Sequence, residues 1–150
     1  MKRYIEIEKQ VYQEIEKNCF GNKKRNGYRH LFGVSHLCLL YSIRFQLDQE
    51  LCAIMGLLHD YSVYKNNTSF NHAFLSSELA QKMLEETLLF DEKEIEIIVE
   101  AIKNHSTKNQ RYDPYSELLK MCDVVETFLH EPEMILDSNK KYYLEKWQKL

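Results

Sequence analysis

The sequence has few residues that interrupt helices and no long hydrophobic segment. Its 150 residues include only four glycines and two prolines, so little in it opposes continuous helix. The longest apolar run, Leu51 to Leu58, has eight residues, far fewer than the roughly 20 that a membrane span needs. The N-terminus alternates charged and apolar residues, unlike a signal peptide. These absences argue against a membrane protein, and we expect a cytoplasmic one.

An excess of positive charge is also missing. Lys and Arg number 20 against 23 Asp and Glu, for a formal net charge of −3, whereas proteins dedicated to nucleic acid usually carry a basic surface. The cysteines Cys19, Cys38, Cys52 and Cys122 lack the C-x-x-C spacing of a zinc or redox site. We therefore expect no nucleic-acid partner, and four buried thiols in a reducing compartment.

Apolar residues at helical spacing are present along most of the chain. The apolar segment 51–58 predicts a central helix, with Asp48 as its N-cap. The spacing of Asp91 and Glu94 is that of a capping box. Polar and glycine-rich stretches predict a break over 19–27 and a loop over 61–71. Further helices are expected over 28–46, from His72 onward, and in a separate segment that ends at about His105. Two more are expected over about 116–130, with Leu129 inward, and from Asp137–Ser138 onward.

No strand-type alternation, repeat or low-complexity segment accompanies this helical pattern. The length suits one domain that can bury a core without disulfide bonds. The sequence therefore predicts a single all-α domain over residues 1–150, with about six or seven helices.

The informative pair is His59-Asp60, which ends the apolar helix. Burying an imidazole beside a carboxylate without partners costs several kcal/mol. A divalent metal would satisfy both groups, because neutral imidazole nitrogen and carboxylate oxygen are common ligands of Mn, Fe, Co and Zn. Two adjacent residues cannot complete a coordination shell, and His30 and Asp123 lie on or beside the apolar faces of their own predicted helices. The sequence thus predicts a metal site built from several helices.

These residues resemble the HD domain of metal-dependent phosphohydrolases. The resemblance rests on His30 with Val34, on AIMGLLHDY, which contains His59-Asp60, and on KMCDVVE, which contains Asp123. It covers about residues 28–130 and implies an HD-type helical bundle flanked by N- and C-terminal helices. It further implies cleavage of a phosphoester or phosphoanhydride bond by a metal-activated water, and one or two divalent ions (Mn, Fe, Co or Zn, with Mg also a candidate). The metal ligands implied by the H…HD…D pattern are His30, His59, Asp60 and Asp123.

Two more histidines extend the resemblance. His72 and His105 resemble residues that bind a second metal or contact the phosphate in several HD subfamilies, including the HD-type diadenosine tetraphosphate hydrolases. The short link between Asp60 and His72 resembles the small HD nucleotide pyrophosphohydrolases instead, which leaves the subfamily open. The sequence departs from the family at Gly33, where Arg is common, and at 62–63, where Gly-Lys is frequent. A phosphate-binding lysine directly after the motif is therefore not expected.

Several residues near the expected site have a functional and an ordinary interpretation. Lys65, Lys108 and Arg111 could hold a phosphate or be solvated loop charges. Glu126 could orient a ligand from outside the coordination shell or lie on the helix surface. The expected partner is a small phosphorylated metabolite, with a nucleotide favoured, and the aromatic C-terminal segment is compatible with a homodimer. The alternatives are a catalytically silent HD-fold module that binds nucleotide or regulates, and a helical interaction domain.

Overall fold

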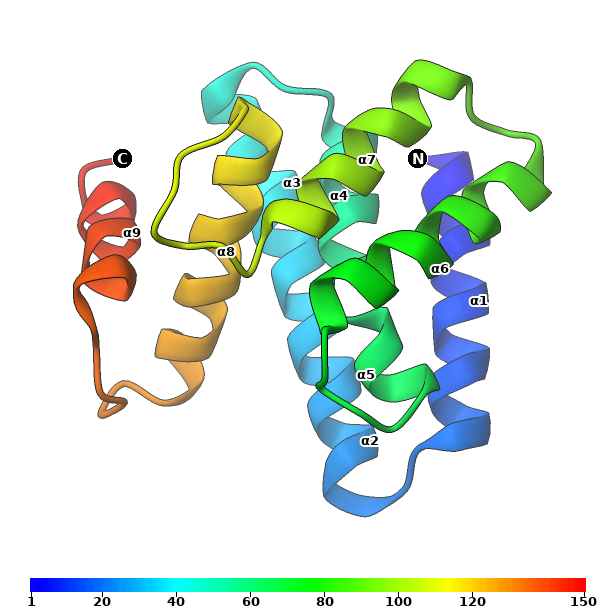
Figure 1. Cartoon of the computed structure of the whole chain (residues 1–150), viewed down its shortest axis with the longest axis horizontal. Helices are drawn as coiled ribbons and strands as arrows, with labels where there is room; N and C mark the ends of the chain where they lie inside the picture. Colours follow the sequence, from blue (N-terminus) through cyan, green and yellow to red (C-terminus); the bar gives the residue numbers. More distant parts are fainter.

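Every regular element of the computed structural model, which describes residues 1–150, is helical. Seven helices have ten residues or more, as the sequence predicted, and two short α-helices and one π-helix accompany them (Figure 1). None of the helices is long and apolar enough to cross a membrane. In chain order the elements are α1 (Lys2–Asn18), α2 (Gly21–Gly27), the π-helix η1 (Tyr28–Phe32), α3 (Gly33–Phe45), α4 (Gln49–Leu58), α5 (Tyr61–Lys65), α6 (His72–Thr87), α7 (Glu92–Asn104), α8 (Pro114–His130) and α9 (Ser138–Gln148).

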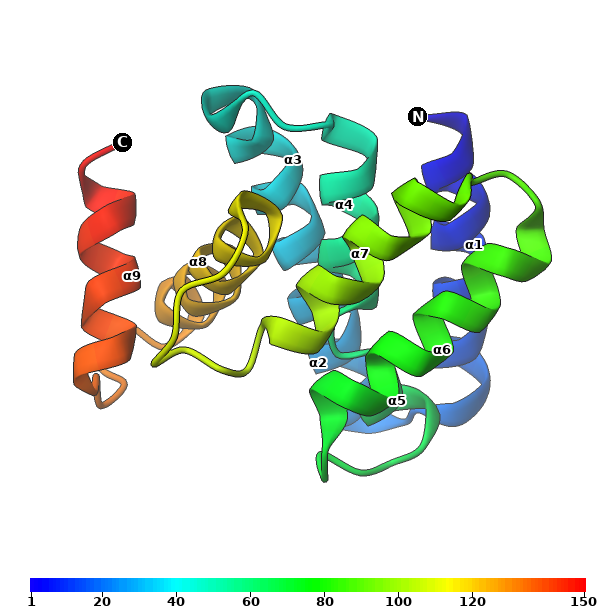
Figure 2. The same ribbon diagram turned by 45° about the horizontal axis from the view of Figure 1, so that its top comes forward.

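Helix α4 lies at the centre of the molecule, as its apolar sequence predicted. All residues from Leu51 to Leu58 are buried, and α4 packs against α1, α3, α7 and α8. In both overall views α8 and α9 lie on one side and α1 and α6 on the other (Figures 1 and 2). Gly56 permits a close approach to α3, because a Cβ there would lie 2.8 Å from the Cα of Ser35. This central position carries His59 and Asp60 from the end of α4 to the edge of the core.

Helix starts follow the predicted caps. The Asp48 carboxylate accepts a hydrogen bond from the Leu51 amide at 2.9 Å, and Asp91 with Glu94 forms the full capping box of α7. Asp137 caps α9 in the same way. Each cap satisfies an amide that the first helical turn leaves without a partner.

The predicted break over 19–27 is wrong in most of its length. Only Cys19 and Phe20 are extended, and the chain re-enters helix at Gly21, whose φ of 55° suits glycine. Helix α2 ends at Gly27, where a Cβ would lie 3.0 Å from a ring carbon of Tyr64. Seven residues without an apolar period hid this helix, which packs against η1 and α1.

The predicted loop over 61–71 is wrong in its first half, where the chain forms α5. The Ser62 amide donates to Ser76 Oγ at 3.0 Å, and the Ser62 hydroxyl donates to the His72 carbonyl at 3.2 Å, so these bonds fasten α5 to α6. A five-residue helix is too short to show a period. Leu129, predicted to face inward, is 57% exposed near the end of α8. All four cysteines are buried and free, as expected.

Candidate metal centre

Six residues singled out from the sequence meet where five elements converge. His30 comes from η1, His59 and Asp60 follow α4, and His72 begins α6. The end of α7 brings His105 and the middle of α8 brings Asp123. We call this set the histidine–aspartate cluster: His30, His59, Asp60, His72, His105 and Asp123.

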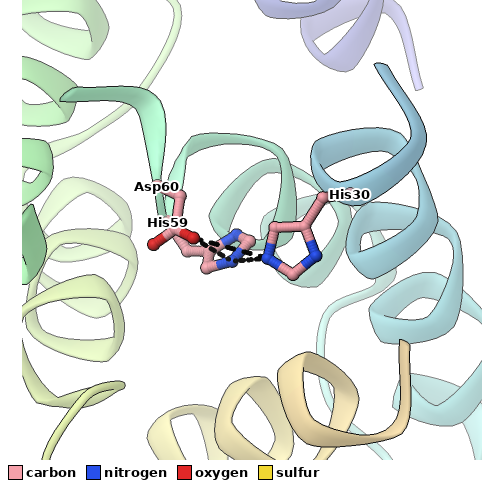
Figure 3. A group of neighbouring side chains, drawn as sticks. All are labelled: His30, His59 and Asp60. Carbon is pink, nitrogen blue, oxygen red and sulfur yellow. Dashed lines mark hydrogen bonds and ion pairs between the residues drawn. The ribbon is translucent and has the colours of Figure 1, made fainter. Parts of the chain in front are cut away.

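Four of its members form a tight first group. The Nε2 atoms of His30 and His59 lie 3.1 Å apart, and Asp60 Oδ2 lies 3.4 Å from each (Figure 3). Asp123 Oδ1 lies 3.3 Å from His30 Nε2 and 3.6 Å from His59 Nε2. Atoms that share one ion at about 2.0–2.2 Å lie about 3–3.6 Å from one another. Each of these His–His and His–Asp distances therefore matches the spacing between two ligands of a single ion.

The second oxygen of Asp60 faces the other two histidines. Asp60 Oδ1 lies 3.1 Å from His105 Nε2 and 3.4 Å from His72 Nε2. Three sets of donor atoms lie within 4.8 Å of one another: His30, His59 and Asp60; His59, His105 and Asp123; and Asp60, His72 and His105. Asp60 thus faces all four histidines, with Oδ2 toward His30 and His59 and Oδ1 toward His72 and His105.

Hydrogen bonds outside the cluster determine which imidazole nitrogen faces inward. Three rings donate Nδ1–H to the carbonyl three residues earlier: His59 to Gly56 at 2.7 Å, His72 to Ser69 at 3.2 Å and His105 to Ile102 at 2.6 Å. A carbonyl only accepts, so in these rings Nδ1 carries a proton and Nε2 is the nitrogen that faces the carboxylates. Metal-binding histidines are usually oriented in this way.

His30 is held by a carboxylate instead of a carbonyl. Its Nδ1 donates to Glu126 Oε2 at 2.5 Å, and Arg29 Nη1 donates to Glu126 Oε1 at 2.7 Å. The structure therefore places Glu126 where it can orient His30, the role that the sequence left open. Sequence reasoning missed Arg29, because its partner lies 97 positions away and nothing local separates it from the neighbouring basic residues 23–25.

The two carboxylates of the cluster are strongly held in the ionised form. Burial favours the protonated form of Asp60, but the positive charge of His59 and hydrogen bonds from neighbouring histidines hold its pKa well below the usual range. Burial also favours the protonated form of Asp123. The charge of Lys108 and the hydrogen bond with His30 outweigh burial and hold the pKa of Asp123 well below the usual range. Two partly buried carboxylates in this state attract a cation.

The pKa values of the histidines are shifted by the same charges. Burial lowers the pKa of His30, but hydrogen bonds to Asp123, Asp60 and Glu126 outweigh it and raise the pKa to about 12. Burial also lowers the pKa of His59, but the charge of Asp60 outweighs it and raises the pKa to about 9. At the fully enclosed His105 burial prevails and the pKa falls. Protons at His30 and His59 supply positive charge where their Nε2 atoms face each other.

The donor set fits a divalent ion. With Nδ1 protonated, two Nε2 lone pairs at 3.1 Å repel each other unless a proton or a cation lies between them. Imidazole nitrogens and carboxylate oxygens are common ligands of Mn, Fe, Co and Zn. The histidine–aspartate cluster can therefore hold a metal ion.

The three predicted substrate-binding cations lie in different surroundings. Lys108 Nζ lies 2.8 Å from Asp123 Oδ2 and donates to the His105 carbonyl at 3.1 Å, so Lys108 adjoins the cluster. The Arg111 guanidinium instead stacks on the ring of Tyr142 at 3.7 Å. Lys65 forms an ion pair with Glu14 at 3.5 Å. Neither Lys65 nor Arg111 contacts the cluster.

The all-helical fold and the arrangement of His and Asp place this chain in the class of helical proteins with a candidate metal site. Comparison with known proteins identifies the family. The HD domain family model matches residues 27–127. The chain therefore belongs to the HD domain family. The family match and the cluster together support membership in a superfamily of metal-dependent phosphohydrolases.

A solved structure shows the same fold. It is the crystal structure of a predicted HD superfamily hydrolase from an uncultured Thermotogales bacterium, with a TM-score of 0.63 and 18% sequence identity. The alignment covers 93% of this chain and 84% of that one. A comparison with curated proteins found no matching sequence.

Proposed function

We propose that this protein hydrolyses a phosphoester or phosphoanhydride bond of a small phosphorylated metabolite, a nucleotide in the favoured case, with the aid of one or two divalent ions. The observation that carries the proposal is the position of Asp60, whose two oxygens face separate groups of inward-facing imidazole nitrogens. In this proposal His30, His59, Asp60 and Asp123 hold one ion. His72 and His105, with Asp60, hold a second ion or contact the phosphate.

A bound divalent ion would activate water for attack at phosphorus and neutralise charge on the phosphoryl oxygens. The chain's own residues would prepare that step. The external hydrogen bonds of the histidines keep their rings oriented before substrate arrives, so little reorganisation is needed.

The exposed edge of the cluster would receive the substrate. The side chain of His72 is 31% exposed, whereas that of His59 is completely buried. His72 is therefore the imidazole that substrate reaches most easily, and with one ion bound it could donate a hydrogen bond to the phosphate or a proton to the leaving oxygen. Lys108, beside Asp123, would neutralise part of the phosphate charge.

The test is a screen for released phosphate and pyrophosphate. Deoxynucleotides, dinucleoside polyphosphates, cyclic nucleotides and sugar phosphates would each be incubated with Mn²⁺, Fe²⁺, Co²⁺, Zn²⁺ and Mg²⁺. We expect metal-dependent turnover of at least one class, lost with chelator and in Asp60→Ala. Tight nucleotide binding without product would indicate a silent binding module, and protein without stoichiometric metal would indicate an interaction domain; either result rejects the proposal.

A further inference from the structure

His30 differs from the other histidines of the cluster in the charge of its outer partner. His59, His72 and His105 donate to neutral carbonyls, whereas His30 donates to the Glu126 carboxylate at 2.5 Å. A carboxylate partner makes an imidazole a stronger ligand than a carbonyl does, because its negative charge raises the electron density of the ring. The four imidazoles are therefore unequal donors.

Glu126 occupies space that Gly33 leaves free. A Cβ at position 33 would lie 2.9 Å from Glu126 Cγ and 3.3 Å from Glu126 Oε1. The Glu126 side chain cannot swing aside without loss, because one oxygen is bonded to His30 and the other to Arg29. Gly33 has ordinary helical geometry at the start of α3, so close approach, and not a special backbone conformation, accounts for its missing side chain.

Arg29 completes the arrangement. Its Nη1 lies 2.7 Å from Glu126 Oε1, while its Nε is buried without a hydrogen-bond partner. A buried unpaired donor is unfavourable, so the ion pair with Glu126 is the contact that compensates for placing the guanidinium there. Glu126 itself is only 7% exposed, which protects both of its bonds from water.

We propose that Gly33, Glu126 and Arg29 form a positioning unit that makes His30 the strongest imidazole ligand of the cluster. It follows that an ion at His30, His59, Asp60 and Asp123 binds more tightly than an ion at Asp60, His72 and His105. Glu126 acts through His30 and touches neither ion nor substrate. This inference rests on the proposed metal centre and adds an order of filling to it.

The test is a titration of the metal-free protein with Co²⁺. Equilibrium dialysis and the visible absorption of the bound ion measure the affinity of each site. In Glu126→Gln the shape is kept and the charge is lost. We expect the tighter Co²⁺ affinity to fall about 10- to 100-fold, the usual effect of removing an outer partner of a metal ligand. The weaker affinity should change by less than about twofold. An unchanged tighter affinity overturns the proposal.

A double-mutant cycle tests the contribution of Gly33. Gly33→Ala alone should weaken the tighter Co²⁺ site to a similar extent, because the new methyl group displaces the Glu126 carboxylate. In a Glu126→Ala background the same change should add less than about twofold, since the clash partner is gone. If the two substitutions act independently, so that their fold-losses of Co²⁺ affinity multiply in the double variant, the role of Gly33 is overturned.

Two controls separate the possible failures. Glu117→Gln changes another buried carboxylate of α8, away from the cluster, and should leave the tighter Co²⁺ affinity unchanged; an equal loss there means general loosening of α8 and rejects the positioning role. Wild-type protein that binds no Co²⁺ rejects the metal centre itself. Wild-type binding with an unaffected Glu126→Gln variant rejects only the positioning unit. Circular dichroism verifies that each variant is folded.

Discussion

The molecule buries two polar clusters, and they differ in how their charges are balanced. In the C-terminal ion cluster, formed by Glu117, Lys120 and Tyr143, the Glu117 carboxylate accepts from Lys120 Nζ at 2.8 Å and from the Tyr143 hydroxyl at 2.9 Å. Lys120 Nζ also donates to the Gln110 carbonyl at 2.9 Å. In the histidine–aspartate cluster two carboxylates face the Nε2 atoms of four imidazoles, and Lys108 Nζ lies 2.8 Å from Asp123 Oδ2.

The two clusters also differ in the groups that they could still bind. The C-terminal ion cluster joins α9 to α8 through Tyr143 and needs no further group. Burial lowers the pKa of Lys120, and the adjoining Glu117 charge opposes that effect. In the metal-free histidine–aspartate cluster, protons on His30 and His59 balance the carboxylates, and a divalent ion would take their place. Burial of charge alone therefore does not distinguish the two clusters, whereas the convergence of several imidazoles with two carboxylates does.

The largest expected effect is the loss of Asp60. Asp60→Ala removes both oxygens that join the two donor groups, so bound metal and phosphate release should disappear together. The loss should exceed the roughly 10- to 100-fold that removal of an outer partner causes. Metal analysis of the purified variant and a phosphate-release assay measure it. A metal-free variant with full activity would contradict the mechanism.

Breaking the C-terminal ion cluster should instead reduce stability. Lys120→Met leaves the Glu117 carboxylate buried without its ion-pair partner, which should lower the free energy of unfolding by about 3 kcal/mol. Urea denaturation measures this change. The Co²⁺ affinity of the folded variant should stay within about twofold, and adding Glu117→Gln should recover much of the stability. A large drop in Co²⁺ affinity would show that the two clusters are coupled.

The pH dependence of stability should change sign on metal binding. In metal-free protein the pKa values of His30 and His59 are raised from 6.5 to about 12 and about 9. The stability that their charges contribute is therefore complete below about pH 6.5 and is lost as pH rises toward 9 and above. With Co²⁺ the protons are replaced, and binding strengthens as pH rises. Urea midpoints at about pH 6.5 and 8.5, with chelator and with Co²⁺, should move in opposite directions; parallel shifts would refute this account.

The smallest effects are expected at two lysines outside the donor set, Lys65 and Lys108. Lys65→Ala should alter metal affinity and turnover by less than about twofold, because an exposed ion pair such as Lys65–Glu14 contributes little. Lys108→Ala should raise KM more than it lowers metal affinity, since Lys108 adjoins the cluster beside Asp123. Steady-state kinetics on the same substrate compares the two variants. Equal effects would remove the distinction between Lys65 and Lys108.

Local features of the fold were predictable because they depend on neighbours in sequence. The caps Asp48, Asp91 and Asp137 act on amides three residues away, and the apolar run 51–58 has no polar face to expose. Helices α2 and α5 were missed because seven and five residues give too short a period to detect. Their stability comes from contacts such as Gly27 with Tyr64, which join distant parts of the chain.

The candidate site was predictable in its residues and not in its arrangement. The chemistry of His59-Asp60 at the end of an apolar helix calls for more donors, and the HD resemblance supplied His30 and Asp123. Which of the basic residues adjoins the cluster was not accessible, because Lys65, Lys108 and Arg111 are equivalent in sequence terms. The structure separates them: Lys108 turns toward Asp123, whereas Arg111 turns toward Tyr142.

Periodicity, capping and side-chain chemistry are local properties, so they were enough to predict the all-α class, most helix starts and the donor types available for a metal. The packing of the helices is what places Asp60 between two pairs of histidines and brings Glu126 to His30 through the space at Gly33. Those relations join elements as far apart as η1 and α8, and their distances depend on how the helices pack around α4.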